Sequence, residues 1–216
     1  MHDSKYVKIS IGMKFLLAKK NSMTEIFSDD GTMTAATILH AAPNTVVFVK
    51  RQDKDGYVAV QVGEGERKEK NISKSVRGHM KALGNFSALR EFRIEDENVH
   101  KIGDKIDVTV FSPGDRVEVS AISKGKGFQG VVKRHGFRGG PRTHGQKHSE
   151  REPGSIGGGL RTRVPKGMRM AGRMGGERIT VKNLKVLQVI PEANEILISG
   201  AVPGRRGTLV EIKSKN

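Results

Sequence analysis

Residues 124–178 restrict the fold of this chain more than any other stretch. These 55 residues hold 14 Lys or Arg, three acidic residues and 15 Gly, but only 11 apolar side chains. Ordering a backbone costs about 1–2 kcal/mol per residue, which buried apolar surface must offset, so such a stretch cannot build a core of its own. The formal charge of +16 divides into +2 for residues 1–123, +11 for residues 124–178 and +3 for residues 179–216.

This charge distribution indicates a densely anionic polymer as the partner, and nucleic acid before any other. The chain has no cysteine, which excludes a disulfide framework, a thiolate nucleophile and a thiolate zinc site. Its apolar runs are all shorter than the roughly 18 residues of a membrane helix. We expect a cytoplasmic protein with no membrane partner, no small-molecule substrate and no cofactor.

Outside this insert the sequence predicts short strands joined by turns. Thr45–Lys50 is a β-branched run and Tyr57–Val62 alternates, and the Asp-Gly pair between them predicts a hairpin. Ile106–Val110 and Arg116–Val119 flank a Pro-Gly-Asp turn and predict a second hairpin. The strands predicted after the insert are Ile179–Ile190, Glu195–Ser199 and Thr208–Lys213.

One helix is predicted, starting after a capping Ser73 and ending at Gly84. Its apolar residues, at helical spacing, are Val76, Met80 and Leu83. Many short strands with closing turns favour a mainly β fold, a closed β-barrel with one short helix, because closure removes exposed sheet edges. Closure requires strands on both sides of the insert to pair.

The predicted domain organisation follows from that closure. Residues 13–123 and 179–216 form one globular barrel domain, and residues 124–178 leave it as a long, irregular, glycine- and arginine-rich finger. Phe128, Val131 and Val132 are expected to extend the strands of the barrel. Residues 136–170 are expected to become ordered only on RNA, because they bury too little apolar surface.

Lys124–Phe128 alternates cations with glycines, which let the backbone approach a phosphate closely. Arginine forks suit bidentate phosphate contacts and stacking on exposed bases. The insert has two aromatic residues, too few for a stacking platform, so recognition of shape and backbone is favoured. The residues expected to bind RNA are Lys124, Lys126, Phe128, Lys133, Arg134, His135, Arg138, Arg142, His144, Lys147, His148, Arg151, Ser155, Arg161, Arg163, Lys166, Arg169, Arg173 and Arg178.

Two other motifs in the insert are weak. Gly154–Gly157 comes close to the G-x-S-x-G turn of serine hydrolases, but Pro153 stands where the first glycine belongs. His144 and His148 have a spacing found in zinc sites, yet no cysteine accompanies them. We therefore predict no catalytic residue and no metal site.

Four motifs stand out in and beside the insert. They are SKGKGFQGVVKR at Ser123–Arg134, THG at Thr143–Gly145, PGSIG at Pro153–Gly157 and KGMRMAGRMG at Lys166–Gly175. With these motifs the chain resembles the universal family of large-subunit ribosomal protein L3, in its bacterial form. Further matches outside the insert are Ser22–Phe27, Asp55–Tyr57, Gly78-His79, Glu91–Arg93 and Gly200–Gly204.

The resemblance implies a barrel of the translation-protein type on the subunit surface. It implies a finger through 23S-type ribosomal RNA toward the peptidyl-transferase centre, and a structural and early-assembly role in place of catalysis. Its implied neighbours are the ribosomal proteins L14 and L19. Residues 1–12 precede the usual family start and form an extra segment. Gly158-Gly159 stands where many members carry a methylatable glutamine, so methylation is not expected there.

Two rival functions fit a cationic chain. A DNA-compacting architectural protein would show wedge residues or a dimer interface, and competition between ribosomal RNA and duplex DNA would distinguish it. An RNA-processing enzyme would need a carboxylate cluster or a nucleophile with a base, whereas residues 124–178 hold only three acidic residues.

Overall fold

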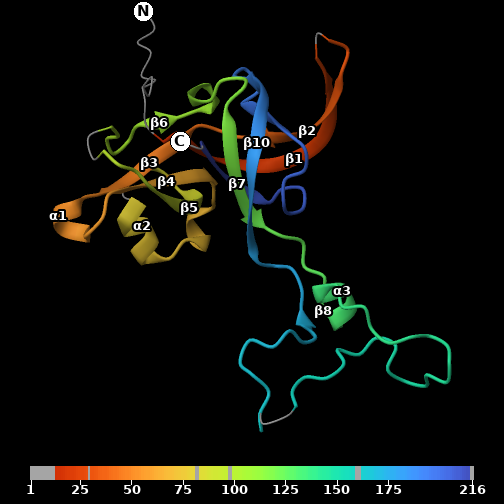
Figure 1. Cartoon of the computed structure of the whole chain (residues 1–216). Coiled ribbons are helices and arrows are strands. Elements are labelled where there is room, and N and C mark those ends of the chain that lie inside the picture. The colour runs from red at the N-terminus through yellow and green to blue at the C-terminus, as the bar shows by residue number, and fades with distance from the viewer. Residues whose placement is uncertain (1–12, 29, 81–82, 97–98, 159–161, 215–216) are drawn as a thin grey trace, which may run out of the picture. The chain divides into compact units, whose positions relative to one another are not determined.

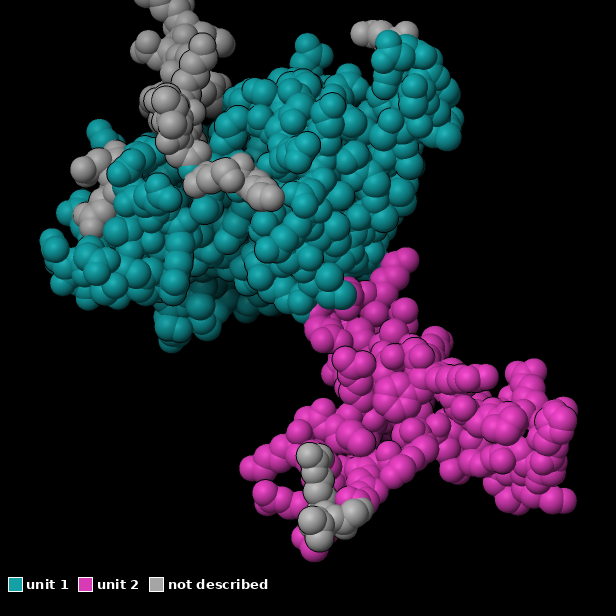
Figure 2. Space-filling view, viewed as in Figure 1, with its two compact units in different colours: residues 1–122, 178–216 teal, residues 123–177 magenta. Residues whose placement is uncertain are grey.

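The computed structural model of the chain describes residues 13–28, 30–80, 83–96, 99–158 and 162–214. The fold is mainly β, as predicted. The chain divides into two compact units, unit 1 with residues 1–122 and 178–216, and unit 2 with residues 123–177 (Figure 2). The extra segment predicted at residues 1–12 lies outside the described residues. Among the described residues, no helix is long and apolar enough to span a membrane.

Unit 1 contains most of the regular structure (Figure 1). Its elements are β1 (Phe15–Phe27), β2 (Met33–His40), β3 (Asn44–Lys50), α1 (Gln52–Asp55), β4 (Ala59–Glu66), η1 (Glu69–Asn71), α2 (Lys74–Met80), β5 (Phe86–Arg93), β6 (Lys105–Ile106), η3 (Val108–Val110), β7 (Arg116–Ile122), β10 (Arg178–Ile190), β11 (Glu195–Ser199) and β12 (Leu209–Ser214). Those of unit 2 are β8 (Phe128–Gln129), α3 (Val131–His135) and β9 (Gly172–Arg173).

Six antiparallel strands of unit 1 pair in a closed ring, in the order β1-β12-β7-β10-β11-β2, and β2 returns to β1. The pairing of β7 with β10 joins the strand before unit 2 to the strand after it. Alternate residues such as Leu16, Val119 and Ile212 lie opposite one another in the register and are buried. This alternation supplies an apolar interior for the ring.

A second sheet of four strands, in the order β5-β4-β3-β6, packs against β1. The ring of Phe15 stacks on that of Phe92 from β5, with centroids 4.6 Å apart. Phe15, Leu16, Leu17 and Ala18 are all buried, so this part of β1 has a core on each of its faces. That is why its sequence is a continuous apolar run without alternation.

Asn44 joins the two sheets with hydrogen bonds. Its Oδ1 accepts from the Leu17 backbone N–H at 2.6 Å, and its Nδ2 donates to the carbonyls of Leu17 at 3.1 Å and Ala42 at 2.9 Å. The side chain is fully buried, so water cannot replace these partners. Lys19 adds an ion pair across the same boundary, with its Nζ 3.1 Å from Oε1 of the buried Glu64.

Several predicted elements are confirmed. β3 and β4 form the first predicted hairpin, although its connection includes α1, which ends at Gly56 with φ +77°. The three strands predicted after the insert correspond to β10, β11 and β12. The helix predicted after Ser73 is α2, and the Ser73 carbonyl accepts from the Arg77 N–H at 2.9 Å.

Other expectations about unit 1 were wrong or incomplete. The second predicted hairpin does not form, because β6 pairs with β3 and residues 108–110 make the 3-10 turn η3. Within α2 the apolar spacing did not mark a single buried face, since Met80 is buried and Val76 is 39% exposed. The long strands β1 and β2 were not among the predicted strands.

We predict that Asn44→Ala lowers the free energy of unfolding by about 2–4 kcal/mol, because it removes three hydrogen bonds, two of them to buried backbone groups of Leu17 and one to the half-buried Ala42 carbonyl. Denaturant unfolding of the full chain measures this. Asn85→Ala, at an exposed site, is the control and should change stability by less than about 0.5 kcal/mol. Equal stability of the two variants would contradict a role for Asn44 in joining the sheets.

Candidate nucleic-acid interface

Unit 2 begins and ends in a two-stranded ribbon. The Ser123 N–H donates to the Glu177 carbonyl, the Lys126 N–H to the Met174 carbonyl and the Met174 N–H to the Gly127 carbonyl, each at 2.9 Å. The ribbon continues into β8 and β9, where Phe128 lies opposite Arg173. Backbone pairing therefore holds the two segments together where apolar burial is scarce.

A glycine in this ribbon serves the protein's own backbone. Gly175 has φ +74°, and a Cβ there would lie 2.1 Å from the Lys124 carbonyl oxygen. An L side chain is excluded by both the left-handed conformation and the close approach. The glycines of the insert were expected to allow close contact with phosphate, but this one allows the ribbon to close.

The segment after β8 is helical, which corrects one expectation. Phe128 pairs with β9 and not with a strand of the ring, while Val131 and Val132 belong to α3. Gly136, with φ +73°, ends α3 and donates its N–H to the Val132 carbonyl at 3.0 Å. The last turn of α3 is cationic, which suits the exposed carbonyls at a helix C-terminus.

Two of the residues predicted to bind RNA hold unit 2 together. The Arg134 guanidinium donates to the Met170 carbonyl at 2.7 Å, and the His135 Nε2–H donates to the same oxygen at 3.0 Å. Both side chains are half-buried. A Cβ at Gly172 would lie 2.7 Å from Arg134 Nη1, so this glycine makes room for the guanidinium.

A second backbone closure shapes the middle of unit 2. The Gly140 N–H donates to the Glu150 carbonyl at 3.0 Å, and a Cβ at Gly139 would lie 2.1 Å from that oxygen. Arg142 Nε lies 2.6 Å from Glu150 Oε1, and its side chain remains 81% exposed. Such an exposed ion pair contributes only about 0.2–1 kcal/mol, so phosphate can displace it at little cost.

The other predicted residues that the structure describes in unit 2 are exposed. They are Lys124, Lys126, Phe128, Lys133, Arg138, His144, Lys147, His148, Arg151, Ser155, Arg163, Lys166, Arg169 and Arg173. Phe128 is 77% exposed, unusual for a phenylalanine in a folded protein. Arg161, also predicted, lies outside the described residues.

The weaker motifs of the insert gain no chemical support. Ser155 Oγ donates to the Gly157 carbonyl at 2.9 Å, which is a local turn contact and not a contact with a general base. His144 has φ +59° and is exposed. In the described part of the chain, no three His, Asp or Glu side chains come together in a way that could hold a metal ion.

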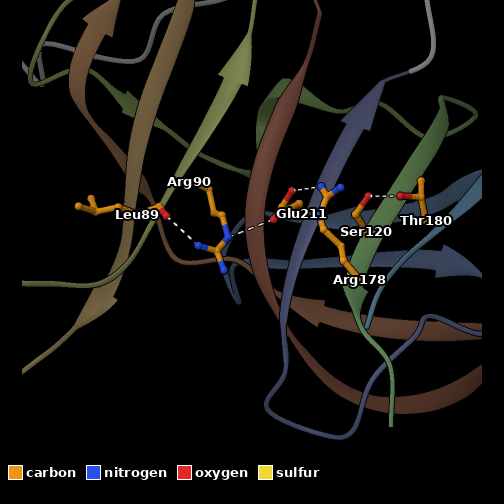
Figure 3. A network of polar contacts seen from close by, with 6 residues as sticks. All are labelled: Leu89, Arg90, Ser120, Arg178, Thr180 and Glu211. Atoms are coloured by element: carbon orange, nitrogen blue, oxygen red, sulfur yellow. Dashed lines mark hydrogen bonds and ion pairs between the residues drawn. The ribbon is translucent and has the colours of Figure 1, made fainter. Parts of the chain in front are cut away.

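Arg178 lies in unit 1, where it is the first residue of β10. Its guanidinium donates to Oε2 of Glu211 on β12, and Arg90 Nε from β5 donates to Oε1 of the same carboxylate at 3.1 Å (Figure 3). Beside this network Ser120 Oγ and Thr180 Oγ1 share a hydrogen bond of 2.7 Å. The Glu211 side chain is only 12% exposed, and it forms ion pairs with both arginines. Part of the positive charge of these arginines is therefore neutralised within the protein.

A second group of exposed cations, in unit 1, was not predicted from the sequence. They lie along η1 and α2 and the segments beside them, and they are Arg67, Lys68, Lys70, Lys74 and Arg77. Arg77 forms an ion pair with Glu69, while the rest of the group outnumbers nearby carboxylates. The net charge of residues 1–123 as a whole is only +2, which conceals this local excess of Lys and Arg. Counting the net charge over short stretches of the sequence would have revealed it.

Comparison with known proteins identifies the family. The family model described as "Ribosomal protein L3" matches residues 61–195. The "Large ribosomal subunit protein uL3" of Herpetosiphon aurantiacus is 47% identical over 199 residues, which are 91% of this chain and 94% of that protein. The chain belongs to the ribosomal protein L3 family.

The family resemblance inferred from the motifs is therefore confirmed. As a member of the L3 family the chain is a structural protein of the ribosome, in the cytoplasm, and not an enzyme. The comparisons give no support to a DNA-binding architectural protein.

We predict that Gly175→Ala opens the ribbon of unit 2, because the new Cβ would meet the Lys124 carbonyl and the backbone would be strained. Amide hydrogen exchange at Lys126 and Met174 should become roughly tenfold faster or more, the equivalent of about 1.4 kcal/mol. Gly125→Ala is the matched control, since its Cβ would meet no atom within 4 Å. Unchanged exchange in Gly175→Ala would show that the ribbon does not depend on this close approach.

Proposed function

We propose that the chain binds 23S-type large-subunit ribosomal RNA through unit 2, and that it supports early assembly of the subunit. The observation that carries this proposal is the separation of charge from core. Unit 2, residues 123–177, holds +10 of the formal +16, while the main hydrophobic cluster belongs to unit 1. An element of this kind gains its stability from a polyanion that neutralises it and surrounds it.

The proposed binding mode follows from the geometry of unit 2. Exposed arginines present planar forks for phosphate oxygens, and glycines keep the intervening backbone free of side chains. Phe128, exposed beside Lys126, offers a single stacking surface for an unpaired base. In this proposal the finger runs through the RNA toward the peptidyl-transferase centre, as the family resemblance implies.

For unit 1 we propose a barrel of the translation-protein type on the subunit surface, with L14 and L19 as neighbours. The closed ring of six antiparallel strands and its buried interior support the barrel assignment. The identity of the neighbours rests on the family resemblance. The exposed cations along η1 and α2 would give unit 1 an RNA contact of its own.

We predict a steep salt dependence for binding to ribosomal RNA. If about half of the 14 cations in residues 124–178 neutralise phosphates, the slope of log Kobs against log salt should be on the order of −5 to −6. Filter binding or fluorescence anisotropy over a range of salt concentrations measures it. A slope shallower than about −2 would rule out phosphate contacts as the main source of affinity.

A triple variant tests where these contacts lie. Replacing Arg138, Arg151 and Arg163 by Gln should make the slope less negative by about 2–3, because each lost phosphate contact releases one counterion fewer. The matched control replaces the exposed Arg51, Lys54 and Lys101 of unit 1 by Gln and should leave the slope nearly unchanged. Equal effects of the two triple variants would argue against unit 2 as the principal RNA-binding element.

We predict that unit 1 folds without the middle of unit 2. Replacing residues 136–170 by a short Gly-Ser linker should leave one cooperative thermal transition, since the main core cluster lies in unit 1. The same variant should enter large subunits poorly when it competes with the unaltered chain. Loss of cooperative unfolding would assign these residues to the core, and normal assembly into active subunits would refute the proposed role of the finger.

A further inference from the structure

β1 and β2 continue as a two-stranded arm beyond the ring of unit 1 (Figure 1). β12 pairs with β1 over Phe15–Lys19, and β11 pairs with β2 over Ala36–His40. Beyond these limits, and past a bulge between Lys20 and Met23, the described residues of the two strands pair with each other. An isolated two-stranded hairpin is at best marginally stable in water, so the arm is an element that gains from a partner. The arm is defined here as residues 21–28 and 30–35.

One face of the arm carries three large apolar side chains that are exposed. Met23, Phe27 and Met33 are 52%, 66% and 54% exposed. Phe27 lies directly opposite Met33 in the register, and Met23 is four residues before Phe27 in the same strand, so all three project from the same face. Glu25 projects from this face as well, between Met23 and Phe27. Large apolar side chains grouped on a projecting element are typical of protein interaction sites. Methionines adapt their shape to a partner surface.

The charge of the arm separates it from the rest of the chain. Residues 21–35 contain Glu25, Asp29 and Asp30 and no Lys or Arg, in a chain whose formal charge is +16. Glu25 and Asp30 are exposed. Carboxylates repel the phosphates of RNA, and the arm offers no cation to offset that repulsion. The same carboxylates attract a basic protein surface and orient it.

Resting on the proposed function, we propose that this arm docks on a second protein of the large subunit, at an apolar patch surrounded by Lys and Arg. Phe27 and Met33 are the anchors that enter the patch. Glu25, on the same face as the anchors, and Asp30, near the end of the arm, form ion pairs with the surrounding Lys and Arg. The partner thus covers three apolar side chains that the described part of the chain leaves exposed.

Photo-crosslinking in assembled subunits tests this. The full chain carries p-benzoylphenylalanine at Phe27, is incorporated into large subunits and is irradiated. We expect an adduct that survives ribonuclease, is cleaved by protease and contains a Lys- and Arg-rich protein of the large subunit. The same label at Ile102, which is 57% exposed elsewhere in unit 1, is the control and should not give this adduct.

The crosslinked protein is then purified and its affinity for the full chain is measured. The double variant Phe27→Ser, Met33→Ser should raise the Kd by about tenfold or more, because interface anchors contribute most of the binding energy. Glu25→Lys with Asp30→Lys should slow association and weaken its salt dependence. Ile102→Ser is the control and should bind like the unaltered chain. All these positions are exposed, so an unchanged unfolding midpoint confirms that each variant is folded.

The outcomes distinguish this inference from the proposed function. If the labelled chain enters subunits but Phe27 crosslinks to RNA, or to nothing, the docking proposal is wrong and the proposed function stands. Anchor variants that bind the partner with unaltered affinity would also overturn it. If the chain does not enter large subunits at all, the proposed function fails and the docking proposal fails with it.

Discussion

The antiparallel pairing of β7 with β10 is the constraint on which the rest of the structure depends. It places Ile122 opposite Arg178, so the 55 residues between them leave and return at neighbouring points. Because loop-closure entropy grows only with the logarithm of length, this pairing can hold a long insert at modest cost. Without it the ring would lack one of its six neighbour pairs.

The two units use opposite means of stabilisation. Unit 1 buries apolar side chains on both faces of β1, and Asn44 gives β-ladder-like hydrogen bonds where two sheets meet. Unit 2 has little to bury, and it is held by backbone closures that need glycine at Gly139 and Gly175 and by the contacts of Arg134 and His135 with the Met170 carbonyl. Such closures fix local geometry, while the charge stays at the surface.

Local patterns predicted local structure well. The β3–β4 hairpin, the strands after the insert and the mainly β class follow from alternation and turn residues, and the family follows from its motifs. Contacts between residues far apart in the sequence could not be predicted from such local patterns. The run Phe15–Ala18 lacks alternation because both faces are buried, and β6 pairs with β3 instead of the nearer β7. Arg134 and Arg178 find partners 36 and 33 positions away, which charge counting cannot reveal.

These intramolecular partners change how the charge of the chain should be counted. Arg134 donates to a carbonyl, and Arg90 and Arg178 share one carboxylate, so these guanidinium groups already have partners within the protein. The arm carries carboxylates in a chain that is otherwise cationic, and these carboxylates are far from the finger in the sequence. A net charge of +16 therefore averages over surfaces that differ in charge. Recognition by this protein depends on where each charge is held, and strand register and glycine-dependent backbone closures decide that position.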